Sequence, residues 1–161
     1  MHVSYFELWQ KFMYMLFDPD NFGLPRIERI YIGIMAAASR QSSYLFHFLK
    51  EEFKNDRRYE DYKEWLEDGF DALPARFQEL SILNEKLAAK PWELSPDDIS
   101  KLTTNINEWW RDSDLIYAII IMAWFHSLAG ICCGIGVNAE LDDKAGHTVC
   151  TTILCVCGPS F

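Results

Sequence analysis

Positive charge is scarce in this sequence. It holds 15 lysine and arginine residues against 24 aspartate and glutamate residues, which gives a formal net charge of −9 and a pI near 4.8. A protein this acidic repels phosphate backbones, and no basic patch stands out along the chain. We therefore expect no nucleic-acid partner.

Signals for export are also missing from the N-terminal residues MHVSYFELWQKF. This stretch lacks the charged start, the long apolar run and the small-residue cleavage site of a secretory signal. The five cysteines form no spaced framework and cannot all pair with one another, which favours reduced thiols inside a cell. The expected location is the cytoplasm, with the nucleus as a second location.

No cluster with the spacing of a structural metal site is present either. His147, Cys150, Cys155 and Cys157 could be drawn together on paper as ligands. However, a Cys-x-Cys pair lacks the two-residue spacing of zinc knuckles. We expect neither a metal nor a cofactor.

Apolar residues, by contrast, are plentiful. They make up 50% of the 161 residues, which is enough for one domain with a sizeable core. The stretch 24–53 organises it, because its periodicity predicts two helices that meet at a corner over residues 39–42. Ser42 or Ser43 is expected to cap the second helix. The apolar stripe of the first helix comprises Ile27, Ile30, Tyr31, Ile34, Met35 and Ala38.

Other helices are expected on both sides of this pair. An amphipathic helix over 5–17 precedes it, and a helix that opens at Pro74 ends before Lys90-Pro91. The run Ser95-Pro96-Asp97-Asp98 is a strong helix start, followed by a buried face of Ile99, Leu102 and Ile106. The charged segment 51–79 carries a helical stripe of Tyr59, Tyr62, Trp65, Leu66 and Phe70, and fits either a solvated outer helix or a partner-docking face.

The longest uncharged run spans residues 115–137. Its length alone would suit a membrane-spanning helix. His126 and Ser127 near its middle, several glycines and the lack of basic flanks argue against a membrane. We expect a central core helix that is hydrophobic all round because neighbours surround it.

Three blocks of this sequence resemble the N-terminal domain of the sestrin family. They are RIERIYIGIMAAASRQSSYLFHFLKEEF at 26–53, LNEKLAAKPWELSPDDI at 83–99 and DLIYAIIIMAWFHSLAGICCGIGV at 114–137. They occur in family order and spacing over roughly residues 5–137. The resemblance implies an all-α helical bundle similar to the alkyl hydroperoxide reductase AhpD-like fold.

The resemblance also implies where a peroxidase site would lie. In that class a cysteine at the start of the second helix attacks the peroxide, with a histidine two turns further on. The matching positions here are Ser42 for the cysteine and Leu49 for the histidine, while Tyr44 is retained. A serine hydroxyl cannot form a sulfenic acid, so these degenerate positions make peroxidase activity doubtful.

Other residues do not restore the lost chemistry. His47 lies about 140° around the helix from Ser42, so we expect it to be exposed or at the edge of the core. His126 reads as a satisfied core histidine, and Cys132 and Cys133 as inert buried thiols. A reductase that uses Cys132 or Cys133 remains the alternative to a non-catalytic role.

We expect residues 1–137 to form a sestrin-like N-terminal helical domain and residues 138–161 a divergent, poorly ordered, cysteine-rich tail. The resemblance implies a stress-response regulator that restrains target-of-rapamycin signalling through the amino-acid-sensing GATOR complex. The resemblance implies that the leucine site of the family lies in a second domain, which we expect to be missing from these 161 residues. No membrane span is expected.

Overall fold

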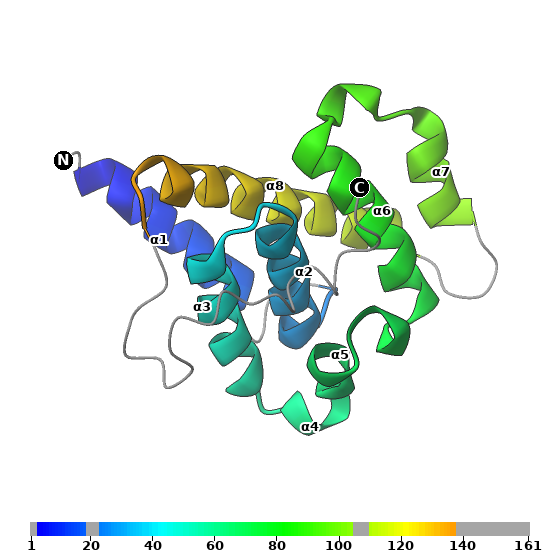
Figure 1. Ribbon diagram of the computed structural model, residues 1–161, viewed down its shortest axis with the longest axis horizontal. Helices are drawn as coiled ribbons and strands as arrows, with labels where there is room; N and C mark the ends of the chain where they lie inside the picture. The colour runs from blue at the N-terminus through cyan, green and yellow to red at the C-terminus, as the bar shows by residue number, and fades with distance from the viewer. Residues whose placement is uncertain (1–2, 19–22, 105–109, 138–161) are drawn as a thin grey trace.

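The computed structural model describes residues 3–18, 23–104 and 110–137, and these residues contain helices and no strand (Figure 1). The predicted all-α class is confirmed, whereas the AhpD-like arrangement stays a prediction. The predicted boundary at residue 137 and the tail 138–161 lie outside the described residues. The helices are α1 Val3–Phe17, α2 Arg26–Ser39, α3 Ser43–Lys54, α4 Tyr59–Tyr62, α5 Glu64–Glu67, α6 Ala75–Ala89, α7 Pro96–Thr104 and α8 Asp112–Gly134, with 3-10 turns at Gly69–Ala72 and Pro91–Glu93.

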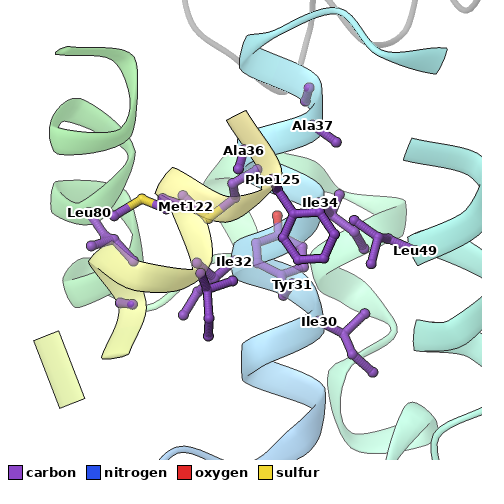
Figure 2. Close-up of a cluster of buried hydrophobic side chains, with 14 of the residues drawn as sticks. Ile30, Tyr31, Ile32, Ile34, Ala36, Ala37, Leu49, Leu80, Met122 and Phe125 are labelled. Carbon is purple, nitrogen blue, oxygen red and sulfur yellow. The ribbon is translucent and has the colours of Figure 1, made fainter. Parts of the chain in front are cut away.

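Helix α2 is the centre of the bundle. Every residue from Ile27 to Ala38 is buried, because α3, α8, α6 and α1 all pack against it. Each fully buried isoleucine on such a helix contributes roughly 1.5–3 kcal/mol. Figure 2 shows the side chains around this helix: Ile30, Tyr31, Ile32 and Ile34 of α2, Leu49 of α3, Leu80 of α6, and Met122 and Phe125 of α8.

Two arginines near the start of α2 hold the end of α1. Arg29, only 1% exposed, donates from Nη1 to the Leu16 carbonyl and from Nη2 to the Asp18 carbonyl, both at 2.6 Å. Arg26 Nε donates to the Phe17 carbonyl at 3.0 Å. The last carbonyls of a helix have no partner within the helix and form the negative end of its dipole. These two side chains, here called the arginine clamp, therefore bind α1 firmly to α2.

A third charged residue of α2 is buried on another side. The carboxylate of Glu28, 4% exposed, accepts a hydrogen bond from Arg76 Nη2 of α6 at 2.7 Å. Burial raises the pKa of Glu28, and the neighbouring Arg76 opposes that rise. The Arg76 guanidinium also lies over the rings of Phe77 and Trp110, 5.0 and 5.2 Å from their centroids. The ion pair is thus enclosed by an aromatic cluster.

The charged segment after α3 differs from the single outer helix that its periodicity predicts. It is broken into the short helices α4 and α5 and a 3-10 turn. Its aromatic stripe nevertheless packs inward, since Trp65 is 8% exposed and lies 5.1 Å from the Tyr31 ring. The segment therefore covers one end of α2 and presents its acidic side chains outward.

Helices α6 and α7 largely follow their predicted signals. Pro74 directly precedes α6, and Ser95 precedes α7, where Asp98 Oδ2 accepts from both the amide and the hydroxyl of Ser95 at 2.9 Å. Lys86 and these Ser95 bonds lower the pKa of Asp98 to about 2. Leu102 is buried as predicted, Ile99 is 37% exposed and so not part of a buried face, and Ile106 lies outside the described residues.

Helix α8 is not surrounded on all sides, which corrects the prediction. One side, including Met122 and Phe125, packs on α2 and α6. The opposite side carries Ile116, Ile120 and Ile131, which are 58%, 44% and 57% exposed. Among the described residues, α8 alone is long and apolar enough to cross a membrane by length and composition, a test that core helices also pass.

Candidate functional site

The corner between α2 and α3 is built by a tight backbone motif. The Ser42 amide donates to the Ala37 carbonyl at 3.0 Å and the Gln41 amide to the Ala38 carbonyl at 2.9 Å. This pattern is a Schellman motif, in which the left-handed position is usually glycine. Here Gln41 occupies it with φ of 53°. An L-residue in this conformation costs roughly 1–2 kcal/mol, so the corner stores backbone strain.

Ser42 occupies the position that the resemblance assigns to the reactive cysteine. It is half-buried and precedes α3, where its carbonyl accepts the Phe46 amide at 3.0 Å. Its side chain makes no cap hydrogen bond, nor does that of Ser43, so the predicted side-chain cap is wrong. A thiolate here would be stabilised by the positive end of the α3 dipole. A serine hydroxyl is a poor nucleophile without an adjacent base.

Leu49 fills the position that the resemblance assigns to a histidine. It is fully buried and points toward Phe125 (Figure 2). A Cβ placed on Gly33 would lie 3.2 Å from Leu49 Cδ1 and 2.8 Å from Phe125 Cε2. The position is therefore a closely packed junction of α2, α3 and α8, and it offers no proton acceptor to Ser42.

Tyr44 and His47 complete the start of α3. Tyr44 is half-buried and packs against the core. His47 is half-buried as well, and its ring meets that of Phe46 edge-on at 5.8 Å. Of the predicted site residues, Ser42 and Tyr44 are therefore half-buried at the start of α3, whereas Leu49 is fully buried in the core.

A buried polar network that sequence reasoning did not find lies beside the corner. His126 Nε2 is 2.9 Å from Asn84 Oδ1, and Asn84 Nδ2 donates to the Ser39 hydroxyl at 2.6 Å and to the Met35 carbonyl at 3.0 Å. Because the Asn84 amide donates to both of these oxygens, its own oxygen accepts from His126 Nε2–H. The network joins α8, α6 and the last turn of α2.

Burial lowers the pKa of His126 to about 4, and the positive charge of Arg40 adds to this effect. The imidazole is therefore neutral near pH 7 and holds its proton on Nε2. The prediction that His126 is a satisfied core histidine is confirmed. Asn84 could have been noticed, since it is the one amide in the apolar stripe that continues from Phe77 and Leu80 along α6.

The space around this network is too small for a substrate. A cavity of about 10 Å³ lies between Tyr31, Ser39 and Asn84, which is room for one water molecule. The network therefore fixes the end of α2 against α6 and α8.

The two described cysteines differ from each other. Cys132 is 7% exposed and its burial raises its pKa, as expected of an inert thiol. Cys133 is exposed, which corrects the prediction that both are buried. Adjacent side chains on a helix point about 100° apart, so the two thiols meet different surroundings. Within residues 3–18, 23–104 and 110–137, no group of three or more His, Cys, Asp or Glu side chains could hold a metal ion.

Comparison with known proteins gives consistent matches. A family model described as PA26 p53-induced protein (sestrin) matches residues 1–157. The chain is 31% identical to Sestrin-3 of Mus musculus over 160 residues, which cover 98% of this chain and 32% of that protein. It is 33% identical to Sestrin-1 of Xenopus laevis over 91% of this chain and 30% of that protein, and 32% identical to Sestrin-2 of Homo sapiens over 88% and 28%. The chain thus spans about a third of the length of these relatives.

The family match also bears on the tail. It continues to residue 157 and so passes the boundary predicted at residue 137. Since the structure describes no residue beyond 137, the boundary stays a prediction.

Proposed function

This chain belongs to the sestrin family, and from that premise we propose that it acts as a non-catalytic interaction module in intracellular stress signalling. The proposed role is negative regulation of target-of-rapamycin signalling in response to oxidative stress and amino-acid starvation. The proposed partners are proteins of the nutrient-sensing GATOR complex. The proposed location is the cytoplasm and the nucleus.

The observation that carries the proposal is the state of the α2–α3 corner. The scaffold of the corner is fully formed, yet Ser42 supplies no thiol and the buried Leu49 supplies no proton acceptor. His126 cannot replace the missing base, because burial lowers its pKa and Asn84 occupies its Nε2. A folded domain without its reactive groups supports a role in binding.

The share of the relatives that this chain covers limits what it would bind. It spans about a third of each relative, and the leucine site implied by the resemblance would lie in the remainder. We therefore propose protein contacts, and no leucine binding, for this part.

The first test is consumption of an organic hydroperoxide with a thiol reductant. We expect no turnover by the native chain and partial recovery by Ser42→Cys, because the α3 dipole favours a thiolate there. A Ser42→Cys, Leu49→His variant would run beside it, with far-UV circular dichroism of each protein, since the imidazole enters a fully buried position. Turnover by the native chain at the rate of the variants would contradict the proposal.

The second test is binding of the purified chain to a purified GATOR complex, with a full-length sestrin as the positive control. Retention of the chain at micromolar concentration supports the proposed partner. No retention, in an experiment where the full-length control binds, would show that this part does not hold the complex unaided.

The alternative function is a thiol-dependent alkyl hydroperoxide reductase that uses a cysteine outside the family position. The exposure of Cys133 favours it over Cys132, whose pKa is raised by burial. Turnover that is present in the native chain and lost in Cys133→Ser would establish this alternative.

A further inference from the structure

The described residues of α1 and α3 form an apolar groove. Its volume is about 510 Å³, which is within the range of ligand and peptide sites. Met13, Tyr14 and Phe17 of α1 line one wall and Phe48 of α3 lines the other. Tyr14 is 73% exposed and Phe48 is 40% exposed, so these aromatic rings have surface available for packing.

The walls of this groove are held in place from behind. The arginine clamp fixes the end of α1 to α2, and the Phe12 ring of α1 packs on Trp124 of α8 at 4.3 Å. Glu52 also lines the groove, but its carboxylate is already paired with Arg26 at 2.8 Å. Asp18 is the other acidic residue of the lining. Since most of the lining is apolar, the groove suits an uncharged apolar occupant.

The same chain contains such an occupant. Residues 148–157, TVCTTILCVC, carry no formal charge and are rich in β-branched and thiol side chains. The charged residues that follow α8, such as Glu140, Asp142 and Asp143, lie in the preceding stretch 138–147. An apolar segment with a polar spacer on one side is expected to seek a surface on which it can be buried.

The exit of the chain from α8 places this segment within reach. The Val137 amide donates to the Cys132 carbonyl at 2.9 Å and Gly136 has φ of 71°, a Schellman motif that ends α8 and turns the chain away from the helix axis. The Phe12 and Phe17 rings of α1 face Trp124 and Phe125 of α8, and Figure 1 shows the end of α8 and the start of α1 on the same side of the view. A ten-residue spacer reaches up to about 33 Å, whereas α1 is about 22 Å long.

We propose that the segment 148–157 docks in the groove between α1 and α3. Tethering raises its effective concentration at the groove to the millimolar range, so even modest apolar burial favours the docked state. The proposal is independent of the proposed signalling role. While the segment is docked, it excludes other apolar ligands from this groove.

Cross-linking in the full-length chain tests this placement. The background protein keeps Cys155 as its sole native thiol, with Cys132→Ala and with Cys133, Cys150 and Cys157 changed to serine. One new thiol is then added at Gln10→Cys, a polar position in the groove that leaves the apolar walls intact. Matched controls carry Ile82→Cys on α6 or Ile120→Cys on α8, both exposed and outside the groove.

With a short bismaleimide reagent, we expect the Gln10→Cys protein to form an intramolecular cross-link at least fivefold faster than either control. The rate should not depend on protein concentration. An added Ile153→Asp, Leu154→Asp change, which leaves residues 3–137 untouched, should lower the rate to that of the controls.

Three results would overturn the proposal. Equal rates for all three thiol positions would mean that the segment has no preferred site. A faster reaction at Ile120→Cys would place it on the exposed side of α8. Cross-links that form only between molecules would assign the groove to a second copy of the chain.

Discussion

Helices α2 and α8 pack against each other, yet their burial is the reverse of what their composition indicates. Helix α2 has Arg26, Glu28 and Arg29 in its first turns, and still every residue from Ile27 to Ala38 is buried. Helix α8 has no formal charge after Asp114, and still one whole side of it is exposed. Burial in this domain is therefore decided by how many elements surround a helix and by whether its charges find partners.

The charges of α2 are tolerated because each one meets a specific group. Arg29 binds the carbonyls at the end of α1, and Glu28 pairs with Arg76. Such partners offset part of the desolvation penalty that an unpaired buried charge would suffer. The exposed isoleucines of α8 carry a smaller penalty, since single exposed apolar side chains are common in folded proteins.

The difference in burial between α2 and α8 can be tested by making the same truncation in both helices. Ile30→Ala in α2 removes a fully buried side chain and should lower the free energy of unfolding by about 2–5 kcal/mol. Ile120→Ala in α8, where the side chain is 44% exposed, should lower it by less than about 1 kcal/mol. Urea unfolding measures both, and equal losses would show that the outer side of α8 is covered.

The free energy of unfolding should depend on pH through His126 of α8. Because burial and Arg40 lower the pKa of His126 to about 4 in the folded protein, the unfolded chain alone takes up this proton below its usual pKa of 6.5. The native chain should therefore lose roughly 3 kcal/mol of stability through this residue as pH falls from 6.5 to 4.

His126→Gln is the control for that titration, since its amide can still donate to Asn84 but does not ionise. Its unfolding free energy should fall less steeply over the same pH range, while the contribution of Asp98 is common to both proteins. Identical slopes for the two proteins would mean that His126 is not shielded from protonation.

Alanine in place of glycine should have opposite effects on the two helices. At Gly33 of α2 a Cβ would lie 2.8 Å from the Phe125 ring, so Gly33→Ala should destabilise by about 1–2 kcal/mol. A Cβ at Gly130 of α8 would meet no atom of the described residues within 4 Å outside its own helix backbone, so Gly130→Ala should stabilise by about 1 kcal/mol through helix propensity. Thermal unfolding of both variants measures the difference, and the same sign at both sites would refute the described packing.

The smallest expected effect lies at the end of α2. Gln41→Gly removes the cost of a side chain at φ of 53° and should stabilise by about 1 kcal/mol. Gln41→Ala keeps the left-handed strain and should bring no gain. If both substitutions changed the unfolding midpoint equally, the strain at this corner would be absent.

Much of the fold followed from periodicity and helix-boundary residues. The α2–α3 corner, the start of α6 at Pro74 and the start of α7 at Ser95 lie at or next to their predicted positions, because proline and serine act locally. The exposed side of α8 was not predictable in this way. A uniformly apolar helix has no pattern that tells which side its neighbours will cover.

The surroundings of the candidate site could not be predicted from the sequence, and its assignment stays a prediction. The resemblance identified Ser42, Tyr44 and Leu49; Ser42 and Tyr44 are half-buried, whereas Leu49 is fully buried two turns further along α3. The polar network was not predictable, because Asn84 of α6 is 45 positions from Ser39 of α2 and 42 positions from His126 of α8. No local sequence pattern links residues that far apart. The left-handed Gln41 was also missed, because glycine is the usual signal for that conformation.

The arginine clamp has a consequence for amide hydrogen exchange. If α1 detached alone, the Arg29 guanidinium would lose its carbonyl acceptors while it remained charged inside the domain. Opening of α1 is therefore coupled to opening of the first turns of α2. The protected amides in the last turn of α1 should exchange together with those of α2, on the slow timescale of the whole bundle and not on that of a fraying terminal helix.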